Sequence, residues 1–348
     1  MKTCNTMKTG KHAFPSRTLR ALGTTAAATL LAFCAALVAA GIAGTLSSCE
    51  HKGFCDPDPG VSRVRVTFDW RRAPGASATG MSLYLYPDGG GEALRYDFDN
   101  AAGGVVEIPP GTYKALFLNN DTENVLFRGT EDYGTFEAYT RPSHLLEPLG
   151  LQSSPADANP TGEAVVLPAD PLWAGRDNAV EVLAAKASPD AAYDQELTFF
   201  PERETCYYTV EVVGVQNLKY ASGLGFSLSG LSGSLMVAGG TRPPLRSTLP
   251  FEARGDGVAS AITGAFHTFG LPSSSNKART LSLYVILTDG SKQFYTFDVA
   301  AQVNGAEDPK RVHIVINGLT LPKPIVEEGG GFLPTVDDWA GENVEVEM

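Results

Sequence analysis

Hydrophobic and polar residues alternate along much of the chain after residue 60, and this alternation limits the folds that it can adopt. Val64, Val66 and Phe68 are interleaved with polar residues, and the same period returns over Leu281–Leu287. A period of two is typical of β-strands with one buried face. No segment after residue 60 carries a sustained helical pattern, and Gly- and Pro-rich turns separate the alternating runs. We therefore expect an all-β fold built from sandwiches.

One hairpin pattern occurs twice in this β-rich region. Residues 82–99 read SLYL, a turn that contains Asp-Gly, and then YDFD; residues 282–298 read SLYV, a second Asp-Gly turn, and then YTFD. Asp-Gly between two alternating runs is a strong signal for a β-hairpin. The repeat predicts two β domains with a similar central hairpin, and chance similarity between two hairpins is the alternative.

The length of the chain also favours two domains, because the 300 residues from Cys49 to Met348 exceed what one hydrophobic core usually supports. We expect an N-terminal β-sandwich over residues 61–200 and a C-terminal β-sandwich over residues 201–348. Residues 149–195 are rich in Pro, Ala, Asp and Gly and should be mostly loops, with Val180–Lys186 as either a short helix or a strand. Val344–Met348 would close the chain as a strand that completes its own sandwich or is donated to another subunit.

A long uncharged run precedes the β-rich region. Residues 1–20 carry five Lys and Arg and no acidic residue, and the uncharged residues 21–48 end in Leu-Ser-Ser before Cys49. A basic lead, an apolar run and a small-residue exit are typical of a secretory signal. The exit resembles the bacterial lipobox, which implies a signal peptide over 1–48, a lipid on Cys49 and a polar tether over 49–60. An uncleaved transmembrane anchor is the alternative, because the run is long enough to span a bilayer.

Charge and cysteine content narrow the classes of function. Without the five basic residues of the expected signal, 22 Lys and Arg stand against 39 Asp and Glu, a net charge of −17. This acidic excess argues against binding to nucleic acid and against a polybasic patch for membrane lipids. Cys4 and Cys34 leave with the signal. Cys55 and Cys206 then remain as a candidate disulfide, with two free thiols as the alternative.

Motifs for catalysis or metal binding are missing from the sequence. No His forms H-E-x-x-H, no Ser lies in a complete G-x-S-x-G, and no Gly-rich loop matches a nucleotide-binding pattern. Asp97–Asn100 starts like a calcium loop but lacks the later ligands. We therefore expect no catalytic residue, no cofactor and no metal site. Trp70, Trp173 and Trp339 are able to stack on sugars, but Trp70 is in phase with a buried strand face, whereas Trp339 should be partly exposed.

The order of short motifs along the chain resembles one family of bacterial lipoproteins. The motifs that follow the lipobox are VRVTFDWR at 64–71, LYLYPDGG at 83–90, NNDTE at 119–123, VQNLKY at 215–220 and DGSKQFYTFDV at 289–299. In this order they resemble Bacteroidales lipoproteins that are related to the fimbrillins and to the minor and anchor subunits of fimbriae.

The resemblance implies two tandem transthyretin-like or immunoglobulin-like β-sandwiches in a lipoprotein of the outer membrane and cell surface. It implies a non-enzymatic role in fimbrial assembly or adhesion. Its implied partners are the outer membrane, through the lipid, and other fimbrial subunits, through β-strand addition. Because β-sandwiches serve many functions, a surface glycan-binding lipoprotein is the alternative.

Overall fold

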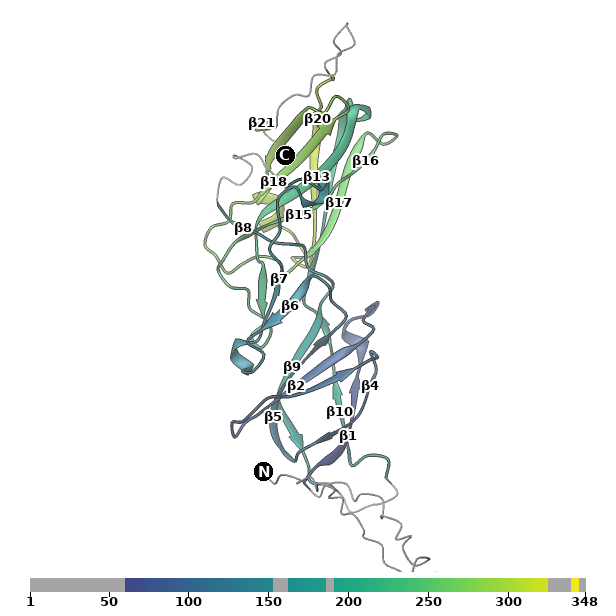
Figure 1. Ribbon diagram of the computed structural model, residues 1–348, viewed down its shortest axis with the longest axis vertical. Helices are drawn as coiled ribbons and strands as arrows, with labels where there is room; N and C mark the ends of the chain where they lie inside the picture. The colour runs from purple at the N-terminus through teal and green to yellow at the C-terminus, as the bar shows by residue number, and fades with distance from the viewer. Residues whose placement is uncertain (1–59, 153–161, 186–190, 325–338, 344–348) are drawn as a thin grey trace, which may run out of the picture. The chain divides into compact units, whose positions relative to one another are not determined.

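The described part of the chain is built almost entirely from β-strands (Figure 1). The computed structural model describes residues 60–152, 162–185, 191–324 and 339–343. The expected signal peptide, Cys49, Cys55 and Val344–Met348 lie outside these residues. The helical segments are η1 (Trp70–Arg72), η2 (Tyr133–Thr135), η3 (Glu147–Leu149), η5 (Leu218–Tyr220) and α2 (Ala300–Asn304). Within the described ranges, no helix is long and apolar enough to cross a membrane.

Strands of the first half form two sheets around one core. Their bounds are β1 (Ser62–Phe68), β2 (Met81–Pro87), β3 (Leu94–Phe98), β4 (Gly103–Ile108), β5 (Gly111–Asn119), β9 (Trp173–Val182), β10 (Gln195–Phe199) and β11 (Glu202–Arg203). One sheet has the order β10-β1-β4, and the other has the order β11-β9-β5-β2-β3. Val64, Val66 and Phe68 of β1 share a buried cluster with Leu83 and Phe117 of the second sheet. The alternation that predicts β1 therefore marks a core face.

A third, small sheet covers the outer face of β2 and β5. It consists of β14 (Ser234–Met236), β7 (Glu137–Thr140) and β6 (Val125–Arg128), in this order. Phe136 and Leu235 pack with Tyr84 and Leu116 in one buried cluster, and the rings of Tyr84 and Phe136 lie 4.9 Å apart between centroids. As a result β2 is buried on both faces, although its alternation indicates only one buried face.

Strands of the second half form a second pair of sheets. Their bounds are β8 (Ala164–Val165), β12 (Cys206–Gln216), β13 (Ala221–Leu231), β15 (Ser247–Glu252), β16 (Arg254–Asp256), β17 (Ala261–Thr268), β18 (Thr280–Leu287), β19 (Lys292–Asp298), β20 (Arg311–Thr320) and β21 (Trp339–Asn343). The orders are β16-β17-β12-β20 and β21-β19-β18-β13-β15-β8. Phe226, Leu283 and Ile314, which come from both sheets, belong to one buried cluster. The expected all-β, sandwich-type fold is confirmed.

The two segments with the shared hairpin motif both form hairpins, although β3 ends its sheet while β19 also pairs with β21. β2 pairs with β3, and β18 pairs with β19, both antiparallel. Gly90 and Gly290 in the two turns have φ angles of 78° and 84°, which Gly reaches without the steric cost that a Cβ atom brings. The segment Val180–Lys186 was expected to be either a short helix or a strand. It begins as a strand, because β9 extends to Val182.

Residues of the expected connector lie against the C-terminal sandwich. β8 pairs in parallel with β15, and Glu163 beside it accepts hydrogen bonds from Gly230 N at 2.8 Å and Arg246 Nε at 2.7 Å. Leu146 packs in a separate buried cluster with Tyr284 on the outer face of the same sheet. Because β8 joins a sheet of the second half and β14 joins strands of the first, the domain limits 61–200 and 201–348 remain a proposal.

Candidate functional site

β1 is the first described strand after the expected tether, and it lies at the centre of its sheet. Five residue pairs join it in parallel to β10, and six join it in antiparallel to β4. Arg63 adds side-chain links to the loop before β10, because its backbone N–H donates to Asp194 Oδ2 at 2.9 Å and its Nη2 donates to Ala191 O at 2.6 Å. A load applied to the N-terminal end of β1 would therefore act on two hydrogen-bond ladders at once.

The residues after β1 fix the other end of this strand. Asp69 N donates to Phe199 O at 2.8 Å, and Trp70 Nε1 donates to Ala101 O at 2.8 Å. The Trp70 ring packs against the first core and meets Trp173 edge-on, with 6.3 Å between the ring centroids. The predicted core packing of Trp70 is confirmed, and both rings are engaged by the fold instead of lying free on the surface.

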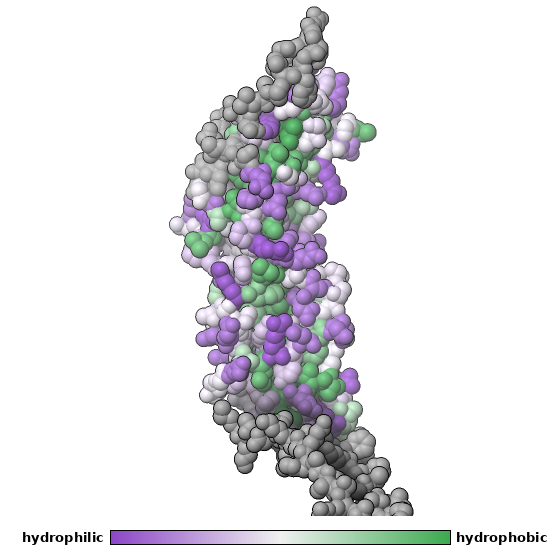
Figure 2. All heavy atoms as spheres, viewed as in Figure 1, coloured by the Kyte–Doolittle hydropathy of each residue, from purple (hydrophilic) through white to green (hydrophobic). Residues whose placement is uncertain are grey.

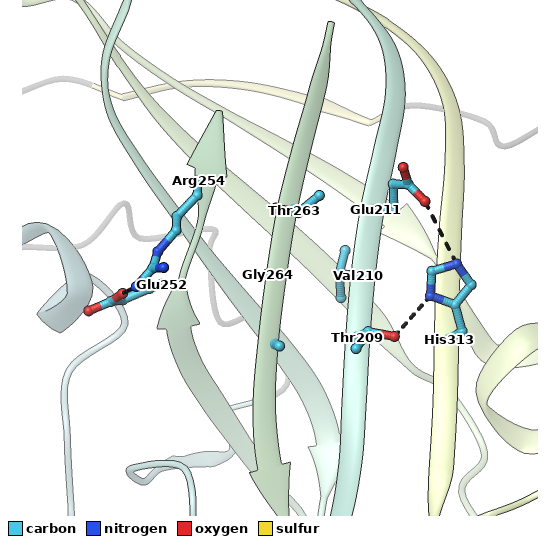
Figure 3. A pocket seen from close by; sticks show the side chains of 9 residues that line it. Thr209, Val210, Glu211, Glu252, Arg254, Thr263, Gly264 and His313 are labelled. Carbon is cyan, nitrogen blue, oxygen red and sulfur yellow. Dashed lines mark hydrogen bonds and ion pairs between the residues drawn. The ribbon is translucent and has the colours of Figure 1, made fainter. Parts of the chain in front are cut away.

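The second candidate is an open trough of about 490 Å³ on the outer face of the β16-β17-β12-β20 sheet. Its floor is formed by the short residues Thr263, Gly264 and Ala265 of β17. A Cβ atom at Gly264 would lie only 2.8 Å from Glu252 O, so a side chain there would need the backbone to shift. Figure 3 shows Arg254 and Glu252 on one side of this floor and residues of β12 and β20 on the other.

Polar side chains in the trough contact one another. Arg254 Nη2 lies 3.0 Å from Glu252 Oε2, and His313 Nε2 lies 3.8 Å from Glu211 Oε2. His313 Nδ1 is 2.9 Å from Thr209 Oγ1, and the predicted place of His313 on the outer strand face is confirmed. Such a lining can hydrogen-bond a polar ligand, but its charged side chains, Glu211, Glu252 and Arg254, are too few and too mixed in sign to form a strong site for a metal ion or a phosphate. Among the described residues, no group of three or more His, Cys, Asp or Glu is placed to hold a metal ion.

Cys206 is the one predicted site residue that the structure describes. It opens β12 as a buried cysteine, and burial raises the pKa of its thiol despite the opposing effect of Arg242. Since Cys55 lies outside the described residues, its disulfide with Cys206 stays a prediction. Trp339 is partly exposed, as predicted, and meets the Tyr284 ring edge-on at 5.7 Å between centroids.

Exposed apolar side chains are scattered over the described surface. The large ones are Val105, Leu183, Tyr207, Leu245 and Val258, which come from different elements. Figure 2 shows hydrophilic and hydrophobic residues interspersed over one face of the molecule. Single exposed apolar residues are normal for a soluble domain surface, so they do not by themselves identify a partner site.

Comparison with known proteins finds similar chains in Bacteroides ovatus. A Bacteroides ovatus protein with the provisional name fimbrium anchoring subunit Fim4B is 27% identical over 334 residues, which cover 86% of this chain and 94% of that protein. A crystal structure from Bacteroides ovatus, provisionally described as an adhesin, has 21% sequence identity and a TM-score of 0.55 over 76% of this chain and 94% of the other. The structural match shows a shared fold.

The family assignment comes from a separate comparison. Residues 48–252, which are more than half of the chain, match one family model. The matched range starts one residue before Cys49 and runs through the first sandwich into β15. The chain belongs to the family described as Domain of unknown function (DUF5119).

Proposed function

We propose that this protein is a lipid-anchored, non-enzymatic subunit of a bacterial surface fimbrium and that it anchors the fimbrium to the outer membrane. The observation that carries the proposal is the similarity over 94% of the relative named as a fimbrium anchoring subunit. The position of β1 supports it, because the strand nearest the expected lipid is held by neighbours on both sides. An anchor needs such a junction if force on the fimbrium is to reach the membrane without unfolding the domain.

The proposed path of this force starts at Cys49. Acyl chains carried by this Cys insert into the membrane, and each buried methylene contributes about 0.8 kcal/mol, so that two or three chains hold stably. Residues 49–60 act as the tether, and two sandwiches over 61–200 and 201–348 extend the chain from it. Other fimbrial subunits then bind by β-strand addition, in which backbone hydrogen bonds supply the affinity.

Glycan binding is the weaker candidate on structural grounds. The trough offers hydroxyl, carboxylate and guanidinium groups, but its lining holds no Trp, Tyr or Phe. Trp70 and Trp173, which are suited to stacking on sugars, pack against each other beside the first core. The similarity to an anchoring subunit supports the fimbrial role instead.

Co-purification from the native cell envelope tests the proposal. A tagged form of the protein is cross-linked in cells, solubilised with detergent and isolated, and its partners are identified by mass spectrometry. We expect fimbrial subunits as the main partners. The same experiment with an unrelated outer-membrane lipoprotein serves as the control. Recovery of glycan-transport proteins in place of fimbrial subunits would contradict the anchoring role and support the glycan alternative.

A further inference from the structure

β20 forms an edge of its sheet among the described strands, since the order is β16-β17-β12-β20. It pairs with β12 in parallel on its inner side. Tyr207 N donates to Lys310 O at 2.8 Å, which shows that backbone groups of even-numbered residues at this end face β12. Because backbone groups alternate in direction along a strand, those of the odd-numbered residues from 311 to 317 face away from the sheet.

One side chain covers the middle of this outer edge. Gln302 of α2 donates from its Nε2 to Val315 O at 2.9 Å, and its Oε1 accepts from Val315 N at 2.8 Å. An amide group carries one acceptor and an N–H donor in the same plane, so Gln302 makes the two bonds that a residue of a neighbouring strand would make. No other side chain in the described ranges hydrogen-bonds to the outward backbone groups of β20. Val303, which is 2% exposed, holds α2 against the core.

Arg311 N at the start of the outer edge donates to Asp308 O at 3.0 Å, but the stretch from His313 to Asn317 has few features that discourage pairing. A strand edge with free backbone groups is a template for another strand, and proteins usually protect such edges with Pro, Lys or bulges. Residues 311–317 contain neither Pro nor Lys. Antiparallel pairing of two copies about Val315 would place His313 of one copy opposite Asn317 of the other, and no like charges would face each other.

We propose that Gln302 closes the outer edge of β20 against pairing with a second copy of this chain. The surface that it closes fits an extended strand, and the self-complementary register about Val315 makes β20 of a second copy the occupant. Removing the Gln302 amide would expose the backbone N–H and C=O of Val315 in the middle of this outer edge. This inference does not depend on the fimbrial role, because it concerns the isolated chain.

Gln302→Ala is the direct test, with Asn304→Ala as the matched control. Ala keeps the helical propensity of α2, and Asn304 lies on the same helix but donates to Lys277 O at 2.7 Å instead of to β20. The full mature chain is studied by analytical ultracentrifugation and by amide hydrogen exchange. We expect Gln302→Ala to form dimers as concentration rises, while the wild type and Asn304→Ala stay monomeric. At low concentration the Val315 amide should exchange at least tenfold faster in Gln302→Ala, and dimer formation should protect it again.

Two further variants keep the inference open to refutation. In Gln302→Glu, the carboxylate still accepts from Val315 N but cannot donate to Val315 O at neutral pH, so this variant should also dimerise. It provides the test if Gln302→Ala fails to fold. Asn317→Pro removes an outward N–H from an edge strand, where Pro is tolerated, and should abolish the dimer of Gln302→Ala. Monomeric Gln302→Ala and Gln302→Glu with a rapidly exchanging Val315 amide would overturn the inference, as would a dimer that survives Asn317→Pro.

Discussion

Truncation of Phe68 gives a quantitative test of how firmly β1 is held. Its side chain is 4% exposed, and its ring centroid lies 5.5, 6.1 and 6.2 Å from those of Phe98, Phe117 and Phe199. These rings come from three other strands, so the cavity left by Phe68→Ala cannot collapse by movement of one loop. Replacing a buried Phe by Ala typically lowers the free energy of unfolding by about 3–5 kcal/mol. Since a domain is usually stable by only about 5–15 kcal/mol, we expect a loss of this size.

Urea unfolding of the mature chain, followed by tryptophan fluorescence, measures this loss. Trp70 and Trp173 report on the first sandwich, whereas Trp339 lies in the second. Val105→Ala on the neighbouring strand β4 is the matched control, because Val105 is 45% exposed and surface changes usually stay within about 0.5 kcal/mol. A loss below about 1 kcal/mol for Phe68→Ala, or equal losses for both variants, would refute the role of β1 as a core-anchored strand.

Four further predictions follow from named residues. Cys49→Ala should leave the precursor uncleaved and without lipid, and normal incorporation of labelled palmitate would contradict the lipobox assignment. Burial and the neighbouring Arg203 lower the pKa of His267; the unfolded chain therefore binds more protons as pH falls below about 6.5, and the folded state should lose stability from pH 7 to pH 5. His267→Gln should reduce this loss in thermal melts at both pH values, and an unchanged pH dependence would contradict the assignment. Deleting Glu342–Met348 should lower the melting temperature, because Glu342 and Asn343 belong to β21, which pairs with β19; an unchanged value together with lost partner binding would identify a donated strand instead. In a Cys55→Ser background, the Cys206 thiol should react with iodoacetamide at least tenfold more slowly in the folded chain than in urea, and equal rates would contradict its burial.

Local sequence patterns were sufficient to predict the strands and turns that the rest of the fold builds on. Val64, Val66 and Phe68 carry a clear period of two, and the observed β1 buries all three. The Asp-Gly turns predicted both hairpins, since a turn and its flanking strands lie within one short segment. These features depend on interactions between residues that are close in sequence.

Features that arise from distant contacts were not predictable in the same way. The second buried face of β2 depends on Phe136 and Leu235, which no periodicity within β2 can indicate. The connector near Glu163 is ordered by Arg246 and Gly230, although its composition alone is typical of a loop.

In the candidate sites, too, the sequence predicted the position of a residue on its strand but not its contacts with distant segments. His313 was placed correctly on an outer strand face, but its contacts with Thr209 and Glu211 depend on the pairing of β20 with β12. Gln302 carried no sequence signal at all, because its function depends on where α2 places it beside the edge of β20. A Gln in a short segment such as Ala300–Asn304 is otherwise typical of solvent-exposed surface.

Retention of fimbriae on cells tests the anchoring function most directly. The native host carries either Cys49→Ala or the control Cys55→Ala, which changes a cysteine outside the lipobox, and fimbrial subunits are quantified in the cell and medium fractions by immunoblotting. We predict that Cys49→Ala releases most of the fimbrial material into the medium, whereas Cys55→Ala keeps it on the cells as in the wild type. Fimbriae that stay fully attached to cells in the Cys49→Ala strain would contradict the anchoring role.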